Sequence, residues 1–178
     1  MIAFALAILV AVASAQEAPE VDEEAAVVEV VADPAPILAC LTEANRDPAT
    51  ERACIGLQAE ACIDGLGAAA DASALAACSA GEAGAWDRIV GALTDEIIGL
   101  LRLQTAAEGG AEGAGPGETL LVEAQTAWGA FREADCAQEA AHWGEDALRD
   151  ATRADCRLNR TATRALELLS KRRQVEAP

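Results

Sequence analysis

Residues 125–136 read QTAWGAFREADC, a stretch without proline or a β-branched run that favours helix. On an α-helix, Trp128, Phe131 and Asp135 lie at positions i, i+3 and i+7, so the three side chains share one face. Trp128 and Phe131 are among the few large side chains of a chain that is only 3% aromatic, and we expect both in the core. The stretch is therefore predicted to belong to a long helix over residues 119–143.

Arg132 follows Phe131 and lies one step round the helix from it. An arginine beside the core can lay its stem on apolar surface while its guanidinium binds a carboxylate or the carbonyl groups of a helix end. We predict this structural role for Arg132, and a role in surface recognition is the alternative.

The next helix, expected over residues 145–173 after a turn at Gly144, carries a stripe of arginines. Steps of three and four residues keep these side chains within an arc of about 80°. The arginine stripe consists of Arg149, Arg153, Arg157, Arg160 and Arg164. A solvated face opposite the core is the simplest interpretation. There are two alternatives. The stripe could bind an anionic partner, or it could bind the acidic residues 16–33 of the same chain.

The strongest hydrophobic periodicity predicts a helix over residues 85–105. Its apolar face, at steps of three and four, comprises Trp86, Ile89, Val90, Leu93, Ile97, Leu100 and Leu101. Five glycines and Pro116 within residues 107–118 then predict a flexible glycine-rich loop, and Thr119 is expected to cap the helix that follows.

Shorter helices are expected nearer the N-terminus. Residues 37–44 are helix-like in composition. Asp47 and Pro48 then supply an N-cap and a first helical position for a helix over residues 48–64.

A third short helix is expected to begin at Asp71 or Ser73 and to end at Gly81 and Gly84. With the longer segments, these elements predict an all-α bundle of helical hairpins over residues 37–173.

Residues 1–15, MIAFALAILVAVASA, predict a signal peptide. The apolar run over residues 2–12 is too short to span a bilayer, which takes about 20 residues. Residues 13–15 have the small-x-small pattern of a signal-peptidase site. A buried N-terminal helix is the alternative, but the stretch has no polar face. We therefore expect cleavage after Ala15 and a periplasmic or secreted protein that begins at Gln16.

The six cysteines are expected to form three disulfides, because an even number in an exported chain is typical of a disulfide framework. Six cysteines allow 15 pairings, but helical hairpins bring together residues at similar distances from a turn. The resulting pairs are Cys40–Cys54, Cys62–Cys78 and Cys136–Cys156. Zinc is a poor alternative, because the chain has no C-x-x-C motif and only His142 could join a cluster.

The formal net charge is −17, from 30 acidic and 13 basic residues, which argues against nucleic acid and anionic membrane surfaces as partners. Residues 16–36 carry seven acidic groups and no basic one, and we expect this segment to be solvated and disordered. Residues 131–178 contain nine basic and nine acidic groups. All of the excess negative charge therefore lies before residue 131.

The chain is poorly equipped for catalysis, with one histidine, one methionine and no tyrosine. It contains no glycine-rich phosphate loop, no G-x-S-x-G, no H-E-x-x-H and no EF-hand loop. The sequence therefore predicts a protein that is not an enzyme and that has no cofactor or metal site.

Residues 120–169 carry the pattern Q-x-x-W-x-x-[F/Y]-R-x-x-[DE]-C, a glycine-containing turn, and C-x(4)-T-x-x-R-x-x-E-L. This combination resembles the LprI-type lysozyme inhibitor domain, a family of small exported helical domains. The matching residues are Gln125, Trp128, Phe131, Arg132, Asp135, Cys136, Gly144, Cys156, Thr161, Arg164, Glu167 and Leu168. The resemblance is looser over residues 37–105, where Cys62 and Cys78 are additional to the simple pattern.

The resemblance implies inhibition of lysozyme, an enzyme that is generally cationic. An anionic inhibitor gains association rate and orientation from a complementary field. The acidic groups of the N-terminal half, or the loop 107–118 inserted into the substrate cleft, would provide the contact. The hypothesis is an exported binding module that occludes a cationic lysozyme-type cell-wall hydrolase. A structural or scaffolding protein of the periplasmic envelope, without inhibitory activity, is the alternative.

Overall fold

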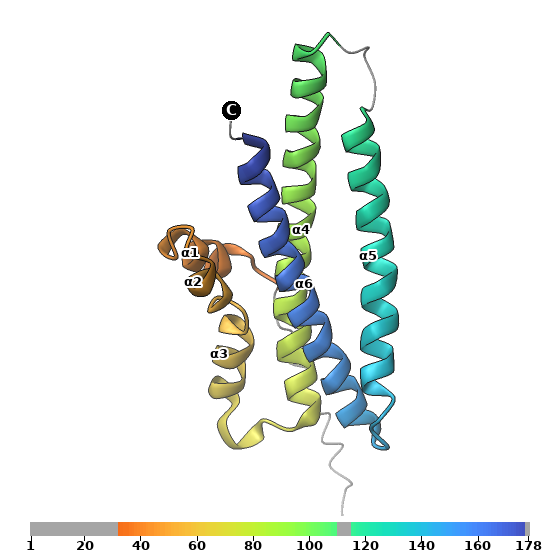
Figure 1. The fold of residues 1–178 in the computed structure, drawn as a ribbon. Helices are drawn as coiled ribbons and strands as arrows, with labels where there is room; N and C mark the ends of the chain where they lie inside the picture. The colour runs from red at the N-terminus through yellow and green to blue at the C-terminus, as the bar shows by residue number, and fades with distance from the viewer. Residues whose placement is uncertain (1–31, 110–114, 177–178) are drawn as a thin grey trace, which may run out of the picture.

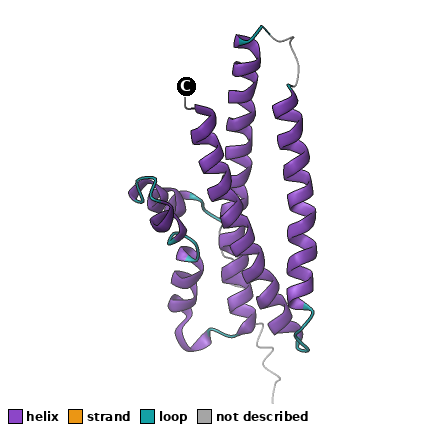
Figure 2. Cartoon of the chain, in the orientation of Figure 1, coloured by secondary structure: helices purple, strands orange, loops and turns teal. Residues whose placement is uncertain are grey.

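The computed structural model describes residues 32–109 and 115–176, and within these ranges the chain forms helices and no strand (Figure 2). In chain order the elements are α1 (Ala35–Glu43), α2 (Pro48–Arg52), α3 (Leu57–Leu66), the 3-10 turn η1 (Gly67–Ala69), α4 (Ala72–Ala107), α5 (Pro116–Ala140) and α6 (Asp146–Glu176). The all-α fold class predicted from the sequence is confirmed.

Three long helices, α4, α5 and α6, form the body of the molecule (Figure 1). The chain runs up α4, down α5 and up α6, so α4 and α6 are parallel and cross each other at close range. Their interface buries Trp86 and Ile97 from α4 and Leu158, Ala162 and Leu168 from α6. The small side chains on α6 let the two helices approach closely, while α5 packs mainly against α6 from one side.

The small helices α1, α2 and α3 lie on the side of α4 that faces away from α5 (Figure 1). Ile37 of α1 is fully buried there, and α3 packs along the first half of α4.

Three disulfides join neighbouring elements: Cys40–Cys54, Cys62–Cys78 and Cys136–Cys156, with Cα–Cα separations of 5.9, 5.7 and 5.5 Å. The second joins α3 to α4 and the third joins α5 to α6. The first joins α1 to the turn that follows α2. These are the pairs that hairpin spacing predicts.

The prediction of one helix over residues 48–64 is wrong, because a turn over residues 53–56 divides it into α2 and α3. Gly56 has a φ of +92°, a left-handed conformation that a glycine adopts without steric cost and that ends the helical path. The start of α2 is as predicted, since the Asp47 carboxylate accepts a hydrogen bond from the Thr50 N–H at 2.8 Å.

The prediction that Gly81 and Gly84 end a helix is also wrong, because α4 runs unbroken from Ala72 to Ala107. A glycine costs a helix interior only about 1 kcal/mol relative to alanine, an amount that close packing can offset. Gly81 is buried, and a Cβ built on Gly84 would lie 3.0 Å from the Cβ of Ala32. Gly84 therefore serves a close contact, and both glycines lie within a continuous helix.

The helix α5 begins and ends earlier than predicted. Pro116 occupies its first turn with Gly115 as the N-cap residue, so Thr119 is not the cap. Proline is well suited to this position, where its missing N–H would have had no partner. The helix ends at Ala140, which leaves Trp143 in the turn before α6 and 47% exposed.

Three predicted segments fall wholly or partly outside the described residues. The signal peptide over residues 1–15 and most of the acidic segment over residues 16–36 precede the first described residue, Ala32. The centre of the glycine-rich loop, residues 110–114, also lies outside.

Candidate functional site

Arg132, on α5, joins all three long helices, and its side chain is only 11% exposed. Its Nη1 donates to Oδ1 of Asp87 on α4 at 2.6 Å and to Oγ1 of Thr161 on α6 at 2.9 Å. Its Nη2 donates to Oε1 of Glu133 at 3.1 Å. A planar guanidinium with several fixed donors suits this arrangement, and a lysine ammonium could not reproduce it.

Trp128 is half-buried beside Arg132 and lies between two guanidinium groups. The Cζ atoms of Arg132 and Arg164 are 4.8 and 6.0 Å from the centroid of its ring, which favours cation–π attraction. Arg164 Nε donates to Oε1 of Gln125 at 2.7 Å, and Gln125 Nε2 donates to Oγ1 of Thr94 on α4 at 3.0 Å. We call this network the polar seam: Asp87, Thr94, Gln125, Trp128, Arg132, Thr161 and Arg164.

The prediction that Phe131 lies in the core is wrong, because its side chain is 53% exposed. The guanidinium of Arg160 lies 5.8 Å from its ring centroid, and the same arginine pairs with Asp135 at 2.7 Å. The helix α5 is the outer member of the bundle and buries only a narrow strip. A rotation of about 60° between Trp128 and Phe131 is enough to bring the second ring to the surface.

The arginine stripe of α6 is largely used in contacts within the molecule. Four of its members have a carboxylate within 4 Å: Arg149–Asp146 at 2.9 Å, Arg157–Glu133 at 3.4 Å, Arg160–Asp135 at 2.7 Å and Arg164–Glu167 at 2.9 Å. Two of these carboxylates belong to α5, so part of the stripe holds α6 against α5. Arg153 has no carboxylate at this distance within residues 32–109 and 115–176.

Glu82, on α4, is a fully buried charged group that sequence reasoning missed. Its Oε1 accepts hydrogen bonds from Gly56 N at 2.8 Å and Trp86 Nε1 at 2.9 Å. Its Oε2 accepts from Gln58 N at 2.9 Å and Ala59 N at 2.8 Å. A side chain 23 to 26 residues away in sequence thus supplies the acceptors for the first turn of α3, whose N-cap residue makes no side-chain bond of its own.

A weak signal for Glu82 does exist in the sequence. The residue lies four positions before Trp86, on the same periodic face as Ile89 and Leu93. A glutamate in line with an apolar face is expected to need buried donors. Three of those donors could not be read from the sequence, because they are backbone groups at the start of a different helix, whereas Trp86 is the fourth donor and lies on the same helix.

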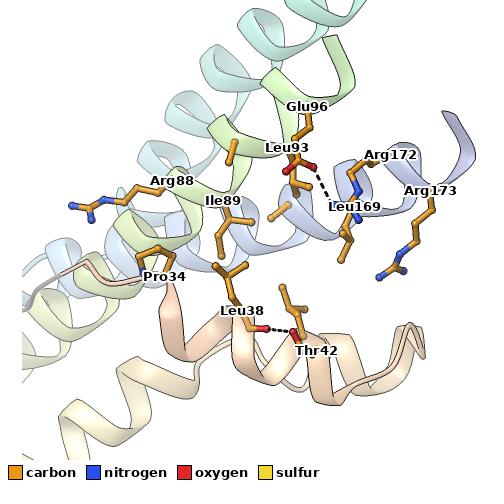
Figure 3. A pocket seen from close by; sticks show the side chains of 13 residues that line it. Pro34, Leu38, Thr42, Arg88, Ile89, Leu93, Glu96, Leu169, Arg172 and Arg173 are labelled. Carbon is orange, nitrogen blue, oxygen red and sulfur yellow. Dashed lines mark hydrogen bonds and ion pairs between the residues drawn. The ribbon is translucent and has the colours of Figure 1, made fainter. Parts of the chain in front are cut away.

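An apolar groove lies between α1 and the pair α4 and α6, with a cavity volume of about 350 Å³. In Figure 3, Leu38, Ile89 and Leu169 point into it from three different helices. Three arginines stand at its rim: Arg88, Arg172 and Arg173. Arg172 pairs with Glu96 at 2.9 Å and Arg173 pairs with Glu51.

Arg102 and Glu118 close the bundle beside the glycine-rich loop. The guanidinium, at the end of α4, donates to both carboxylate oxygens in the first turn of α5, at 2.9 and 2.5 Å. The hydrogen bond from Arg102, aided by the attraction of its charge, holds the pKa of Glu118 below its ordinary value against the opposing effect of burial. The same hydrogen bond raises the pKa of Arg102. The pair thus fixes both ends of the loop.

Within the described ranges, no three His, Cys, Asp or Glu side chains come together as a set of metal ligands. No helix in the same part of the chain combines the length and apolar character needed to cross a bilayer.

Comparison with known proteins places these features in a family. A search of curated proteins and a search of solved structures found no significant match. The family model described as "Lysozyme inhibitor LprI" matches residues 62–168, which contain the polar seam and two of the three disulfides. The helices α1 and α2 and the Cys40–Cys54 bond lie before the matched region. The chain belongs to the LprI lysozyme inhibitor family.

Proposed function

We propose that the protein is an exported helical binding module that inhibits a cationic lysozyme-type cell-wall hydrolase by occluding its substrate cleft. Membership of the LprI lysozyme inhibitor family is the observation that carries this proposal. The action is one of binding rather than catalysis, and the residues of the family pattern serve the fold. The polar seam supports the last point, because its side chains bind one another across α4, α5 and α6.

The negative charge of the N-terminal half supports a cationic target. Residues 32–109 contain twelve acidic and four basic residues. Five exposed carboxylates of this part lie on and around the small helices: Glu43, Asp47, Glu60, Asp64 and Asp71. A cationic enzyme would be drawn to this side of the molecule.

Rigidity of the small helices favours binding at low entropic cost. The Cys62–Cys78 disulfide fixes α3 to α4, and the Glu82 carboxylate holds the first turn of α3 through three backbone N–H groups. A surface that is already ordered loses little conformational freedom when a partner binds. The acidic side of α3 is therefore our first candidate contact surface.

The loop over residues 107–118 is the second candidate contact, because its described ends, where α4 ends and α5 begins, lie at one end of the bundle, from which a loop could enter a cleft. A variant in which residues 110–114 are shortened would separate the two candidates. Loss of inhibition with retained thermal stability would assign the contact to this loop rather than to α3.

A lysis assay with a cationic lysozyme and bacterial cell walls, run across a salt series, tests the proposal. We expect inhibition at low ionic strength that weakens as salt screens the attraction between the two proteins. Absence of both binding and inhibition at low ionic strength, with the three disulfides intact, would refute it.

Matched pairs of substitutions locate the surface. Glu60→Gln with Asp64→Asn removes two exposed charges from α3, and Glu123→Gln with Glu139→Gln removes two exposed charges from α5. We expect the first pair to weaken inhibition by about tenfold at low salt and the second pair to have a much smaller effect. Equal effects of the two pairs would show that only the overall charge matters.

The scaffolding hypothesis makes a different prediction. Capture from envelope extracts would then recover proteins of the same cell rather than lysozyme. Export itself is tested by N-terminal sequencing of the protein recovered from the periplasm or medium, where the proposal expects Gln16 as the first residue.

A further inference from the structure

A second groove lies between the first halves of α4 and α6, on a different side of α4 from the apolar groove described above. Its cavity volume is about 210 Å³. Four small residues form its floor: Ala80, Ala83, Gly84 and Ala154. Side chains this short cannot fill the space between the two helices, so the groove is open to a larger side chain from another segment.

The described chain begins at the edge of this groove. Pro34 lies beside Arg88 in the other groove, next to α1. Two residues earlier, Ala32 lies against Gly84. A Cβ built on Gly84 would be only 3.0 Å from the Cβ of Ala32. Between Pro34 and Ala32 the chain therefore passes round α4 toward the small-residue floor, and the residues before Ala32 start from that point.

Some of the charged side chains on the groove walls have an ion-pair partner in the described residues, and Arg153 has none. Asp87 is paired with Arg132 at 2.6 Å, and Arg157 lies 3.4 Å from Glu133. Arg153 has no carboxylate within 4 Å in residues 32–109 and 115–176, and Asp150 stands on the same wall one turn earlier. A segment with an acidic side chain could complete the pairing of Arg153.

Residues 25–31, AAVVEVV, match this groove in both size and charge. Four valines supply branched apolar side chains for a floor of alanine and glycine, and Glu29 supplies a carboxylate. The segment contains no basic residue that Arg153 would repel. We infer that residues 25–31 of this chain occupy the groove between α4 and α6, with valine side chains on the small-residue floor and Glu29 near Arg153.

The lengths are compatible with this occupant. The floor from Gly84 to Ala80 covers four helical residues, or about 6 Å of rise. An extended chain covers about 3.3 Å per residue, so two residues before Ala32 already reach Ala80. The seven residues of the segment are therefore enough to fill the groove and to continue past its end.

Hydrogen exchange of the full chain, followed by mass spectrometry, tests the inference. In the wild-type protein we expect the amides of residues 25–31 to exchange about tenfold more slowly than those of residues 17–24, after correction for intrinsic rates. Gly84→Leu places a side chain where Ala32 lies and should abolish this protection. Gly91→Leu is the matched control, because it lies on the same helix with open space around it and should preserve the protection.

A second variant separates docking from a general change of α4. Arg153→Glu leaves the groove open but turns its cationic wall acidic, and we expect it to reduce the protection of residues 25–31. Exchange of these residues at unprotected rates in the wild type would overturn the inference. Equal protection in the wild type and in Gly84→Leu would also overturn it. Protection that disappears on dilution would assign the groove to a second copy of the chain instead.

Discussion

Replacing Glu82 by glutamine should lower the free energy of unfolding by about 3 kcal/mol or more. The carboxylate is fully buried and accepts four hydrogen bonds, two on each oxygen. A glutamine keeps the shape of the side chain but replaces one oxygen by an NH₂ group. Whichever way the amide is turned, two buried N–H groups then face a donor in place of an acceptor.

The magnitude follows from the bonds that are lost. A hydrogen bond to a charged group contributes about 1.5–3 kcal/mol, and a buried donor left without a partner costs about 1–3 kcal/mol. If the amide is turned one way, Gly56 and Trp86 lose their acceptor, and if it is turned the other way, Gln58 and Ala59 lose theirs. Two lost hydrogen bonds of at least about 1.5 kcal/mol each give the lower estimate of about 3 kcal/mol.

Urea unfolding with the disulfides intact measures the effect, and Glu123→Gln is the control. Glu123 is exposed on α5, so its substitution should change stability by no more than about 0.5 kcal/mol. Hydrogen exchange should also show faster opening in α3 than in α6 of the Glu82→Gln protein. A change below about 1 kcal/mol, or uniform opening of all helices, would refute the reasoning.

Three further predictions concern the bundle. Arg132→Lys should lower stability by about 1–3 kcal/mol in thermal unfolding, because a lysine cannot bind Asp87 and Thr161 on two helices and also cover Trp128. An unchanged melting temperature would contradict the idea that the polar seam stabilises the bundle. Phe131→Ala should change stability by no more than about 1 kcal/mol in the same measurement, because half of the ring is exposed to solvent. A larger loss would show that the ring is buried in the core. The pKa of Glu118 is lowered in the folded state, so its contribution is complete above the unfolded pKa and is lost as the pH falls through the folded one. The melting temperatures of the wild type and Glu118→Gln should therefore differ at neutral pH and converge on acidification, and a constant difference down to low pH would refute the assignment.

Local patterns in the sequence were sufficient where neighbouring residues decide the structure. Periodic apolar residues predicted the central helix that carries Trp86, and Asp47 with Pro48 predicted the start of α2. The disulfide pairs followed from similar distances on each side of a turn, a property of hairpins that needs no knowledge of the remaining chain.

Packing decided the features that the sequence could not reveal. Gly84 is a helix breaker by propensity, yet it lies inside α4 where Ala32 approaches. Phe131 looked like a core residue, but its burial depends on which side of α5 is covered by α6. Three of the four donors to Glu82 are backbone N–H groups, which carry no sequence signal, and the fourth is the indole N–H of Trp86.

The three disulfides enclose separate stretches of the chain, with spacings of 14, 16 and 20 residues and no overlap between them. Short loops close at low entropic cost, so each bond can form as soon as its second cysteine meets an oxidising environment. The first two cysteines to appear are already a native pair, as are the next two and the last two. Oxidation in order of appearance therefore yields the native connectivity, and the protein has little need of a disulfide isomerase to correct it.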